Sequence, residues 1–522
     1  MSIADIQFAL PDQLTLQTLS EHLGQTQRVL DEPDRRLSRV FYDSFDWRLF
    51  QAGGTLEVVK SDNDKRLVWR GLAGEERRAI PLVEGPPEFA RDLPDDLLRE
   101  SLARLLDVRV LLPKVQVDSR VQTLRVLNDD DKTVLRLLLE SAAYRDPKGG
   151  SSGDLGRRLH LQPVKGYPKP LQQVQSILSR DLGLRPAPGD LVVDALGAIG
   201  CTQGDYSSKL RFNLDPEAPS GVVARDILLH LLGTLEANVP GTRGDLDPEF
   251  LHDLRVAVRR TRSALGQIKG VFPDDQVERF KSLFGWIGQI TGPTRDMDVY
   301  LLAFAGYRDA LPERFRPDLE PLHRFLEAHQ RSEQQALAKK LGSPHFRKIL
   351  KEWRAFLEGP LPEQAGAPNG TRPIRELANE RISKAYKRVL REGLAIGPDS
   401  SAEQMHELRK SCKKLRYLLE FFDSLYPRRR IRAMIEALKV LLDNLGDYQD
   451  LEVQAEKLRE FAHRMIEEGQ VPADTLLAMG MLVDGLLRRQ QQAGVEFSDR
   501  FARFVAADKR QAFKALFSAR AV

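Results

Sequence analysis

The chain has 522 residues, enough for two or more domains that each bury a core. An apolar content of 42% and a charged content of 30% exclude a disordered or fibrous protein, and only two cysteines exclude a disulfide framework. The net charge of +4 is too small to predict polyanion binding by itself, so such binding would require a local basic patch.

The first residues lack the basic start and apolar core of a signal peptide. No stretch approaches the roughly 20 apolar residues that span a membrane. Cys201 and Cys412 form no CxxC pair, and this cysteine usage fits a reducing compartment. We therefore expect a cytoplasmic protein without a membrane partner.

Residues 1–200 are nearly neutral, with 28 Lys and Arg against 30 Asp and Glu. Short alternating or apolar runs between turn-like clusters indicate strands, and two segments have the pattern of amphipathic helices. This part of the chain therefore predicts a mixed α+β domain. The expected strands are Thr55–Val59, Arg66–Arg70, Thr133–Leu139 and Arg158–Val164, and the expected helices are Asp95–Leu106 and Pro170–Leu182.

Strand signals vanish after Pro219, and long segments with a 3.6-residue period continue to the C-terminus. Pro427, Gly292 and Gly446 stand where helices should end. The second domain is therefore predicted to be all-helical. Its expected helices are Ala224–Ala237, Pro248–Val271, Asp275–Ile290, Pro321–Leu341, Phe346–Leu357, Ile374–Glu392, Ser401–Leu425, Ile431–Leu445 and Leu451–Glu468.

The second domain contains an internal repeat. With an offset of 154 residues and no gap, residues 252–299 return as residues 406–453, and His-Asp-Leu-Arg returns as His-Glu-Leu-Arg. Repeated charged residues at fixed spacing suggest that each half presents the same charged face as well as the same fold. Below, two residues that are 154 positions apart are called corresponding residues.

These observations predict a first domain at residues 1–205 and a second domain at residues 215–518. The second domain should consist of two related halves, at about 220–358 and 372–518. Glycine and proline cluster between them, which predicts a flexible joint at about 359–371.

Three of the expected helices carry four basic residues each at the spacing +3, +4, +3. A helix advances about 100° per residue, so each set of four falls within an arc of roughly 80° on one face. Four like charges on one face repel one another, and an anionic ligand would compensate for this. The first two sets correspond under the repeat, and the third has no counterpart in the first half. We call them the first cationic series (His252, Arg255, Arg259, Arg262), the second cationic series (His406, Arg409, Lys413, Arg416) and the third cationic series (Arg381, Lys384, Arg388, Arg391).

A basic stripe on a helix is most often a solvated surface, but such stripes usually include acids at i±4, which these series largely lack. Facing rows of guanidinium groups would line an elongated groove that suits a linear polyanion. Nucleic acid is a competing ligand, although the series lack interleaved aromatic residues for base stacking. His252 and His406 have no further ligand at metal-binding spacing, and we expect Asp296 and Asp450 to cap a helix or pair with an arginine.

The segments LHDLRVAVRRTRSAL…GWIGQITGPTRDMDVYLL and MHELRKSCKKLRYLLEFF…LKVLLDNLGDYQDLEV resemble the two halves of a CHAD domain, over about residues 215–515. This resemblance implies two four-helix bundles related by pseudo-twofold symmetry, and binding of inorganic polyphosphate. The resemblance, rather than the spacing, selects polyphosphate among the polyanions. It assigns the binding role to the first and second cationic series, and we add the third series as a further expected binding face.

The first domain resembles a CYTH domain, a β-barrel tunnel that hydrolyses triphosphates with a divalent metal. The resemblance rests on the segments FYDSFDWRLFQAGGTLEVVK and LHLQPVKGYPKPLQQV. Arg70 and Arg120 would stand for the tunnel lysine and a later arginine of that family. The resemblance implies an antiparallel β-barrel with flanking helices.

The acids that this family uses to bind metal are missing from the corresponding positions. Gln7 lies near the place of a Glu-x-Glu-x-Lys motif, and residues 158–162 hold no acid in either register. Glu57 and Val59 replace expected arginines. Magnesium needs oxygen ligands, and a triphosphate carries too much charge for a site without metal. We therefore expect no catalytic residue, no metal and no cofactor.

The sequence thus predicts an α+β multidomain protein, non-catalytic and cytoplasmic, that binds inorganic polyphosphate through basic helix faces. Association with polyphosphate granules is left open, and nucleic acid is not expected to be the main ligand. Two alternatives remain. One is metal-dependent hydrolysis of triphosphate or polyphosphate in the N-terminal barrel, and the other is a scaffold for nucleic acid or protein partners.

Overall fold

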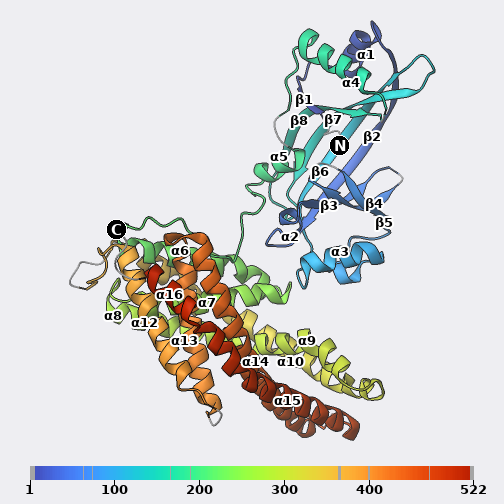
Figure 1. Ribbon diagram of the computed structural model, residues 1–522. Coiled ribbons are helices and arrows are strands. Elements are labelled where there is room, and N and C mark those ends of the chain that lie inside the picture. The colour runs from blue at the N-terminus through green and yellow to red at the C-terminus, as the bar shows by residue number, and fades with distance from the viewer. Residues whose placement is uncertain are drawn as a thin grey trace. The chain divides into compact units, whose positions relative to one another are not determined.

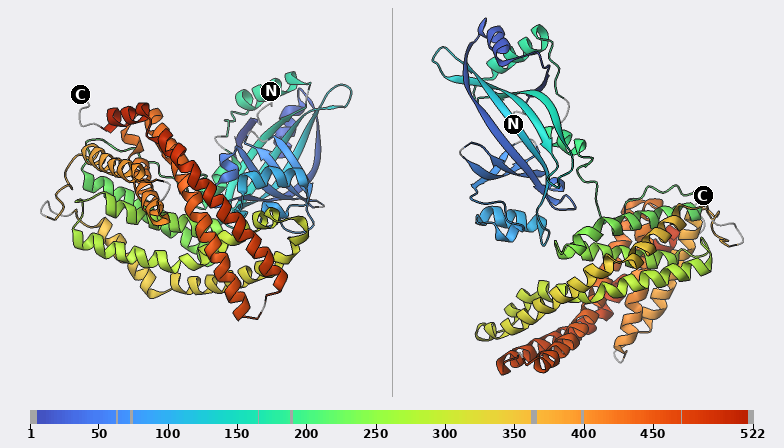
Figure 2. Two further views of the ribbon diagram at one scale, coloured as in Figure 1. Left: turned by 60° about the horizontal axis from the view of Figure 1, so that its bottom comes forward. Right: turned by 180° about the vertical axis from the view of Figure 1, so that it is seen from behind.

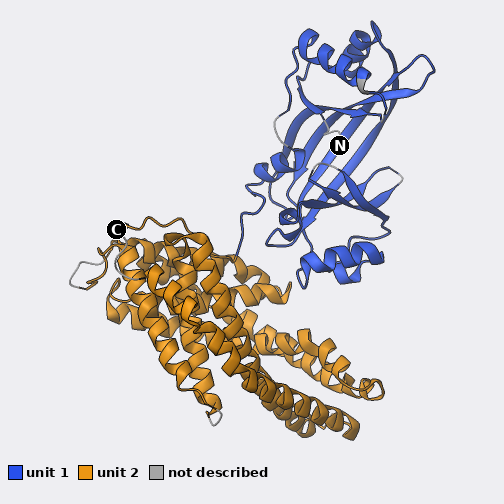
Figure 3. Cartoon of the chain, viewed as in Figure 1, with its two compact units in different colours: residues 1–207 blue, residues 208–522 orange. Residues whose placement is uncertain are grey.

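The chain divides into two compact units, residues 1–207 and residues 208–522 (Figure 3). Residues 362–365, which belong to the expected joint, are not among the residues that the structure describes. The division of the second unit into halves at this joint therefore stays a prediction. The outer limits of the two expected domains, at residues 1–5 and 518, also lie outside. The computed structural model describes residues 6–62, 64–72, 75–164, 166–187, 190–361, 366–397, 400–469 and 471–517.

Unit 1 is built on one antiparallel sheet of eight strands in the order β1-β8-β7-β6-β2-β3-β4-β5 (Figure 1). β1 and β5 are the two edges, and no ladder joins them within the described residues. The sheet is therefore not closed, and the expected barrel is not confirmed. The strands are β1 (Ile6–Leu10), β2 (Arg28–Asp43), β3 (Gly54–Lys60), β4 (Lys65–Gly71), β5 (Glu76–Pro81), β6 (Leu112–Leu127), β7 (Thr133–Arg145) and β8 (Ser152–Pro163).

Helices cover parts of this sheet. The four expected strands are confirmed in β3, β4, β7 and β8, although the one expected at Arg158–Val164 ends one residue earlier, at Pro163. The expected helix over residues 95–106 is also confirmed. It begins at Asp96, directly after Asp95, whose carboxylate accepts a hydrogen bond from the Leu98 N–H, and it buries Leu98, Leu102 and Leu106 at helical spacing. The helices of unit 1 are α1 (Leu16–Gly24), α2 (Arg48–Gln51), α3 (Asp96–Leu106), α4 (Pro168–Ser176) and α5 (Leu191–Ala198), with a short π-helical turn at Ile177–Asp181.

In the described part of unit 2 every regular element is a helix, as the sequence predicts. None of the helices in the described ranges combines the length and the apolar character that a bilayer crossing needs. The helices are α6 (Ser220–Arg243), α7 (Pro248–Gln267), α8 (Asp274–Ile290), α9 (Gly292–Ala310), α10 (Glu320–Leu341), α11 (Pro344–Glu358), α12 (Ile374–Leu394), α13 (Ala402–Phe421), α14 (Arg428–Glu467), α15 (Ala473–Phe504) and α16 (Ala507–Phe517).

The repeat of the sequence is a repeat of helices. α7 and α13 begin and end at corresponding residues, and α6 and α12 begin at corresponding residues. The residues just before α6 and α12, Pro219 and Pro373, also correspond, and they face each other in an isolated antiparallel bridge. The two halves therefore meet at corresponding points of the chain.

The two halves differ where the sequence predicts a helix end at Gly292 and at Gly446. α8 ends at Ile290 and α9 begins at Gly292, but α14 runs through Gly446 without a break, so the prediction at Gly446 is wrong. The residue after each glycine explains the difference. Pro293 lacks the N–H that a continuing helix needs, whereas the corresponding Asp447 can donate it.

The apolar cores of unit 2 do not divide as the two halves of the sequence do. The larger core joins α6, α7, α8 and α11 to α12, α13, α16 and parts of α14 and α15. The smaller core joins α9 and α10 to the C-terminal part of α14 and the first part of α15, which extend together in both views of Figure 2. Since each core draws on both halves, an arrangement of one four-helix bundle per half is not confirmed.

Candidate functional site

The first and second cationic series lie on α7 and α13, which pack against each other. Side chains cap both helices at their start, Asp247 for α7 and Ser401 for α13. The corresponding residues Leu254 and Leu408 are fully buried on the opposite side from the basic residues. Packing of the two apolar faces therefore fixes how the two basic faces are presented.

The histidines at the head of each series are held by corresponding residues. The His252 Nδ1 atom lies 3.2 Å from Nη2 of Arg295 on α9, and the His406 Nδ1 atom lies 2.7 Å from Oε1 of Gln449 on α14. Arginine can only donate, so His252 accepts through Nδ1, whereas His406 can donate through the same atom. Both rings are thus oriented by the neighbouring helix.

The next arginine of each series is also bound within the fold. Arg255 Nη1 donates to the Gly288 carbonyl oxygen at 3.0 Å and to Thr291 Oγ1 at 2.8 Å, at the end of α8. Arg409 Nη2 lies 2.9 and 3.1 Å from the two carboxylate oxygens of Asp450. The expectation that Asp450 pairs with an arginine is confirmed.

The glycines of the repeat stand beside these two arginines. A Cβ atom at Gly292 would lie 3.9 Å from Arg255 Nη1, and one at Gly446 would lie 3.7 Å from Arg409 Nη2. Burial lowers the pKa of Arg255, and the charge of Arg259 lowers it further, while Asp296 acts in the opposite direction. Asp296 and Asp450 therefore act on corresponding arginines.

Arg416, the last residue of the second series, is neutralised inside the protein. Its Nε atom lies 3.3 Å from Oε1 of Glu420, one turn further along α13. The other oxygen of Glu420 lies 3.3 Å from Nη2 of Arg260 on α7. Arg260 Nη1 also donates to the Ser208 carbonyl oxygen at 2.8 Å. Glu420 thus links α7 to α13, and Arg416 contributes to this link.

A large groove opens between the ends of α7 and α8 and the helices α12 and α13, with a volume of about 1120 Å³. We call it the basic groove. Of the 25 described residues that line it, twelve are Lys or Arg and three are acids. Such an excess of one charge over a concave surface concentrates anions there. Its basic residues are Arg259, Arg262, Lys269, Lys281, Arg381, Lys384, Lys387, Arg388, Arg391, Lys410, Lys413 and Lys414, and its acids are Asp274, Glu278 and Glu380.

The structure brings together seven of the twelve residues that the sequence nominates for binding. The five others, two histidines and three arginines, make the contacts described above and do not line the basic groove. The seven are Arg259, Arg262, Arg381, Lys384, Arg388, Arg391 and Lys413, and the five are His252, Arg255, His406, Arg409 and Arg416.

The third cationic series forms one wall of the basic groove. Arg381 is half-buried and donates through Nε to the Gln267 carbonyl oxygen at 2.7 Å, which fastens α12 to the end of α7. Arg388 pairs with Glu392 one turn away. Lys384 and Arg391 are exposed, and neither forms an ion pair within the described part of the chain. These two side chains are therefore available to an anion.

The first and second series meet at Lys413. Burial, together with the charges of Arg409 and Arg259, lowers the pKa of this amine to about 8. Arg259 belongs to α7 and Lys413 to α13, so the two series are close enough for their charges to repel across the helix contact. A bound anion would relieve this repulsion.

Five basic residues of the groove were not nominated from the sequence for binding: Lys269, Lys281, Lys387, Lys410 and Lys414. Lys269 lies seven residues after Arg262, so it continues the spacing of the first series by two turns, beyond the end of α7. Lys281 lies on α8, where no basic series exists, and it pairs with Glu278. The sequence signal was present for Lys269 and absent for Lys281.

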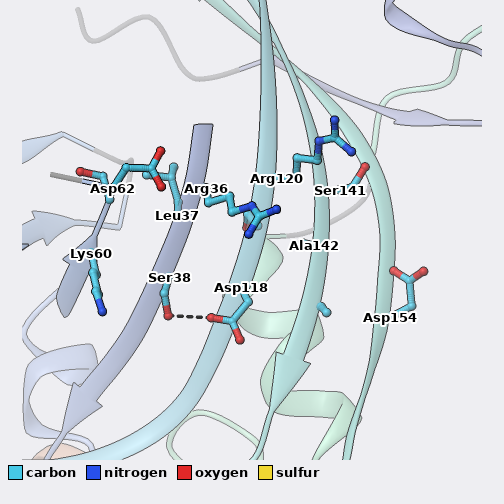
Figure 4. A pocket seen from close by; sticks show the side chains of 13 residues that line it. Arg36, Leu37, Ser38, Lys60, Asp62, Asp118, Arg120, Ser141, Ala142 and Asp154 are labelled. Atoms are coloured by element: carbon cyan, nitrogen blue, oxygen red, sulfur yellow. Dashed lines mark hydrogen bonds between the residues drawn. The ribbon is translucent and has the colours of Figure 1, made fainter. Parts of the chain in front are cut away.

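Unit 1 also has a pocket, of about 780 Å³, on the face formed by β2, β6, β7, the end of β3 and the start of β8 (Figure 4). Its charges balance, with three basic and three acidic residues among the described residues that line it. Ser38 donates to Asp118 at 2.6 Å. Arg120, which the resemblance places in a tunnel, pairs with Asp34, and Arg70 pairs with Glu57 at 2.5 Å.

The interior of the unit 1 sheet holds a further charged cluster. Glu140 pairs with Arg39, accepts a hydrogen bond from Ser119 at 2.6 Å, and lies 2.8 Å from His160 Nε2. Burial alone would raise the pKa of Glu140, but His160, Arg39 and Ser119 outweigh burial and lower it to about 2. The Glu140 carboxylate is therefore held within the protein by Arg39, Ser119 and His160.

The resemblance of the sequence to a CYTH domain would place metal-binding acids on β1 and β8. Gln7 of β1 stands opposite His160 of β8, and Ala9 stands opposite Arg158. Arg158 donates to the Gln7 amide oxygen at 3.2 Å and pairs with Asp194. Among the described residues, no group of three or more His, Cys, Asp or Glu is arranged so that it could hold a metal ion.

Comparisons with protein families and solved structures found the following similarities. Residues 226–459 match the family model of the CHAD domain. The crystal structure of the CHAD domain from the plant Ricinus communis is similar, with a TM-score of 0.44 and 24% identity over 59% of this chain and 97% of that chain. PptA from Streptomyces chartreusis is similar with a TM-score of 0.41 and 17% identity, over 54% of this chain and 99% of that chain. No curated protein matched the sequence.

Proposed function

We propose that the CHAD domain of this chain, matched at residues 226–459, binds inorganic polyphosphate in the basic groove. The observation that carries the proposal is the composition of the groove: twelve basic residues and three acids are among the described residues that line its volume of about 1120 Å³. The choice of polyphosphate among polyanions comes from the CHAD family.

The shape and charge of the groove support a linear ligand. Its walls come from four helices, so a chain of phosphates could contact α7, α12 and α13 at once. Guanidinium groups bind phosphate oxygens through two parallel hydrogen bonds, and ammonium groups add point charges. Arg259, Arg262, Lys384 and Arg391 are exposed and form no ion pair among the described residues, so no internal partner has to be displaced.

The three cationic series then divide into two roles. The seven groove residues would contact phosphate directly. The other five would hold α7 and α13 in place through their contacts with α8, α9, α14 and Glu420. These five are positioning residues in this proposal, and their removal would act through the fold.

The test removes four charges from the groove and leaves the five positioning residues unchanged. The groove variant carries Arg259→Ala, Arg262→Ala, Lys384→Ala and Arg391→Ala. The matched control carries Lys339→Ala, Lys340→Ala, Arg347→Ala and Lys351→Ala, which removes the same charge from exposed positions of α10 and α11 outside the groove. Both are compared with the wild-type chain on polyphosphate beads across a salt series.

We expect the groove variant to lose retention at moderate salt while the matched control keeps it. In nucleic-acid binding each phosphate contact adds about 0.7–0.9 to the slope of log affinity against log salt, so loss of four contacts should flatten the slope by about three. Equal retention of the groove variant and the wild type would refute the assignment of the groove.

Nucleic acid is the main competing ligand of the same groove. Base stacking needs exposed aromatic faces, and Tyr417, the one aromatic residue among the described groove residues, is only 7% exposed. We therefore expect polyphosphate to displace RNA or DNA at matched phosphate concentration. The opposite order of displacement would favour a nucleic-acid scaffold.

We also propose that unit 1 is non-catalytic. The support is that its candidate tunnel cations, Arg70 and Arg120, are already paired with carboxylates, and that Gln7, His160 and Arg158 stand where the related family has acids. Phosphate release from triphosphate or polyphosphate by the full chain, with Mg²⁺ or Mn²⁺, tests this. Robust turnover would restore the hydrolase alternative.

Binding of this kind would place the protein at cytoplasmic polyphosphate granules. Fluorescence microscopy of the tagged chain tests this part of the proposal, with the groove variant as the comparison. Granule localisation that survives in the groove variant would have to arise from another surface.

A further inference from the structure

Unit 2 has a second pocket of a different kind, with a volume of about 510 Å³. It is lined by residues of α12, α13, α14 and α15, together with residues of α16, which packs against α12 and α14. Most of its lining is apolar, and no residue of the basic groove takes part in it. The apolar residues that line it are Tyr386, Leu415, Leu419, Ala433, Met434, Ala437, Leu438, Phe504, Ala512 and Phe513.

The repeat explains why this space exists. In the first half, Phe280 and Phe284 of α8 pack against Trp353 of α11, with ring centroids 4.5 and 5.5 Å apart. The corresponding residues of α14 are Met434 and Leu438, which are smaller. α16 occupies the place of α11, since α11 packs on α6 and α8 and α16 packs on α12 and α14. The second half therefore has two smaller side chains beside the pocket, where the first half has two phenylalanines, although Tyr386 and Phe513 also stack at the pocket.

The mouth of the pocket is basic. Arg429, Arg430 and Lys509 line it together with one acid, Asp508. All three basic residues are exposed, and none forms an ion pair within the described ranges. In the first half the residues that correspond to Arg429 and Arg430 are Asp275 and Gln276, so the basic character belongs to the second half alone.

The start of α14 makes this charge more unusual. Backbone N–H groups at the start of a helix carry partial positive charge, which favours acids in the first turn. α8 follows this rule with Asp274 and Asp275, but the first turn of α14 contains Arg428, Arg429 and Arg430 and no acid. An anion at the mouth of the pocket would compensate for these charges.

We propose that this pocket binds a small amphiphilic anion, a single-chain fatty carboxylate. Its hydrocarbon chain would lie among Met434, Leu438 and Phe513, and its carboxylate would be held by Arg429 and Arg430. Two features decide the chemistry: an apolar interior, which disfavours a bare phosphate chain, and a basic mouth, which repels a cationic amphiphile and gives a neutral one no charge attraction. Known ligand pockets of roughly 300–1,000 Å³ have this combination of apolar walls and few polar groups.

Decanoate is a suitable probe, and binding to the full chain is measured by calorimetry below the concentration at which micelles form. Met434→Phe restores the residue of the first half and should fill the pocket, so we expect it to weaken decanoate binding at least tenfold. The double variant Arg429→Ala, Arg430→Ala changes only exposed residues and should weaken binding about tenfold. Arg432→Ala, an exposed arginine of the same helix outside the pocket, is the matched control and should leave binding unchanged.

Decyltrimethylammonium and decanol separate the charge from the chain, and neither should bind as tightly as decanoate. Equal binding of the cationic amphiphile, or full decanoate affinity in Met434→Phe, would overturn the proposal. Polyphosphate should not displace decanoate, because the two sites share no residue. Displacement at equal charge concentration would show that Arg429 and Arg430 belong to the path of polyphosphate, and it would also contradict the inference.

Discussion

Arg260 of α7 and Arg416 of α13 pair with the same carboxylate, that of Glu420, and both nitrogen–oxygen distances are 3.3 Å. Their side chains are only 15% and 28% exposed, and that of Glu420 is 18% exposed. The two helices that carry the first and second cationic series are therefore held together by an acid that no ligand supplies. The stability of this contact can be measured separately from binding.

Glu420→Gln should destabilise unit 2, because it leaves two partly buried guanidinium groups without their carboxylate. We expect a loss of about 1–3 kcal/mol in the free energy of unfolding, measured by urea denaturation. Glu436→Gln is the control, since Glu436 makes an exposed pair with Lys439 and should cost less than about 1 kcal/mol. Equal effects of the two changes would mean that Glu420 does not link the helices.

Polyphosphate binding should weaken as the pH rises through the pKa of Lys413, which is about 8. An anion favours the protonated amine, so the free protein must take up a proton to bind above this pH. Affinity at pH 9 should therefore fall further below that at pH 7 in the wild type than in Lys413→Arg, whose charge does not titrate in this range. Affinity that depends on pH in the same way in both proteins would place the titrating group elsewhere.

Gly446→Ala should stabilise α14 by about 0.5–1 kcal/mol, because glycine in a helix interior costs this much relative to alanine. The new Cβ atom would lie 3.7 Å from Arg409 Nη2, which is an ordinary contact. Gly241→Ala provides the contrast, since its Cβ atom would lie 2.3 Å from the buried Phe250 ring, and it should destabilise by about 1–3 kcal/mol. Thermal unfolding should therefore show a higher melting temperature than the wild type for Gly446→Ala and a lower one for Gly241→Ala.

Asp298→Asn should stabilise the protein at neutral pH. Burial raises the pKa of Asp298 to about 6, well above its ordinary value, although Arg295 and Gln330 oppose the shift. A carboxyl with a raised pKa binds a proton more tightly in the folded state, so its contribution to stability is lost as the pH rises from about 4 to 6. The variant should therefore gain about 1–3 kcal/mol over the wild type at pH 7.5 and little at pH 4.5, by urea denaturation. A constant difference across this range would contradict the assignment.

Much of the helical unit could be predicted from the sequence, because each half repeats its helix signals. Capping residues, buried leucines and basic residues all recur at one offset, and α7 and α13 accordingly begin and end at corresponding residues. The predicted helix end at Gly446 was wrong because glycine marks a break only if the next residue cannot continue the helix. Pro293 cannot continue it, and Asp447 can.

The first unit was harder to predict in detail. Alternating patterns located strands such as β4 and β7, since a strand with one buried face alternates along the chain. Whether a sheet closes depends on pairing between its first and last strands, which lie far apart in sequence. β1 and β5 form no ladder with each other in the described residues, and a local sequence pattern does not predict whether two such distant strands pair.

The sequence by itself determined the duplication and the three basic series, because helical periodicity fixes which residues share a face. Only the tertiary structure decided which of these cations are free to meet an anion. Arg255 is bound to the end of α8, Arg409 to Asp450 and Arg416 to Glu420, whereas Lys384 and Arg391 face the basic groove. The physical reason is that the charge on a helix face is set by its own sequence, but its partner is set by whichever helix packs against that face.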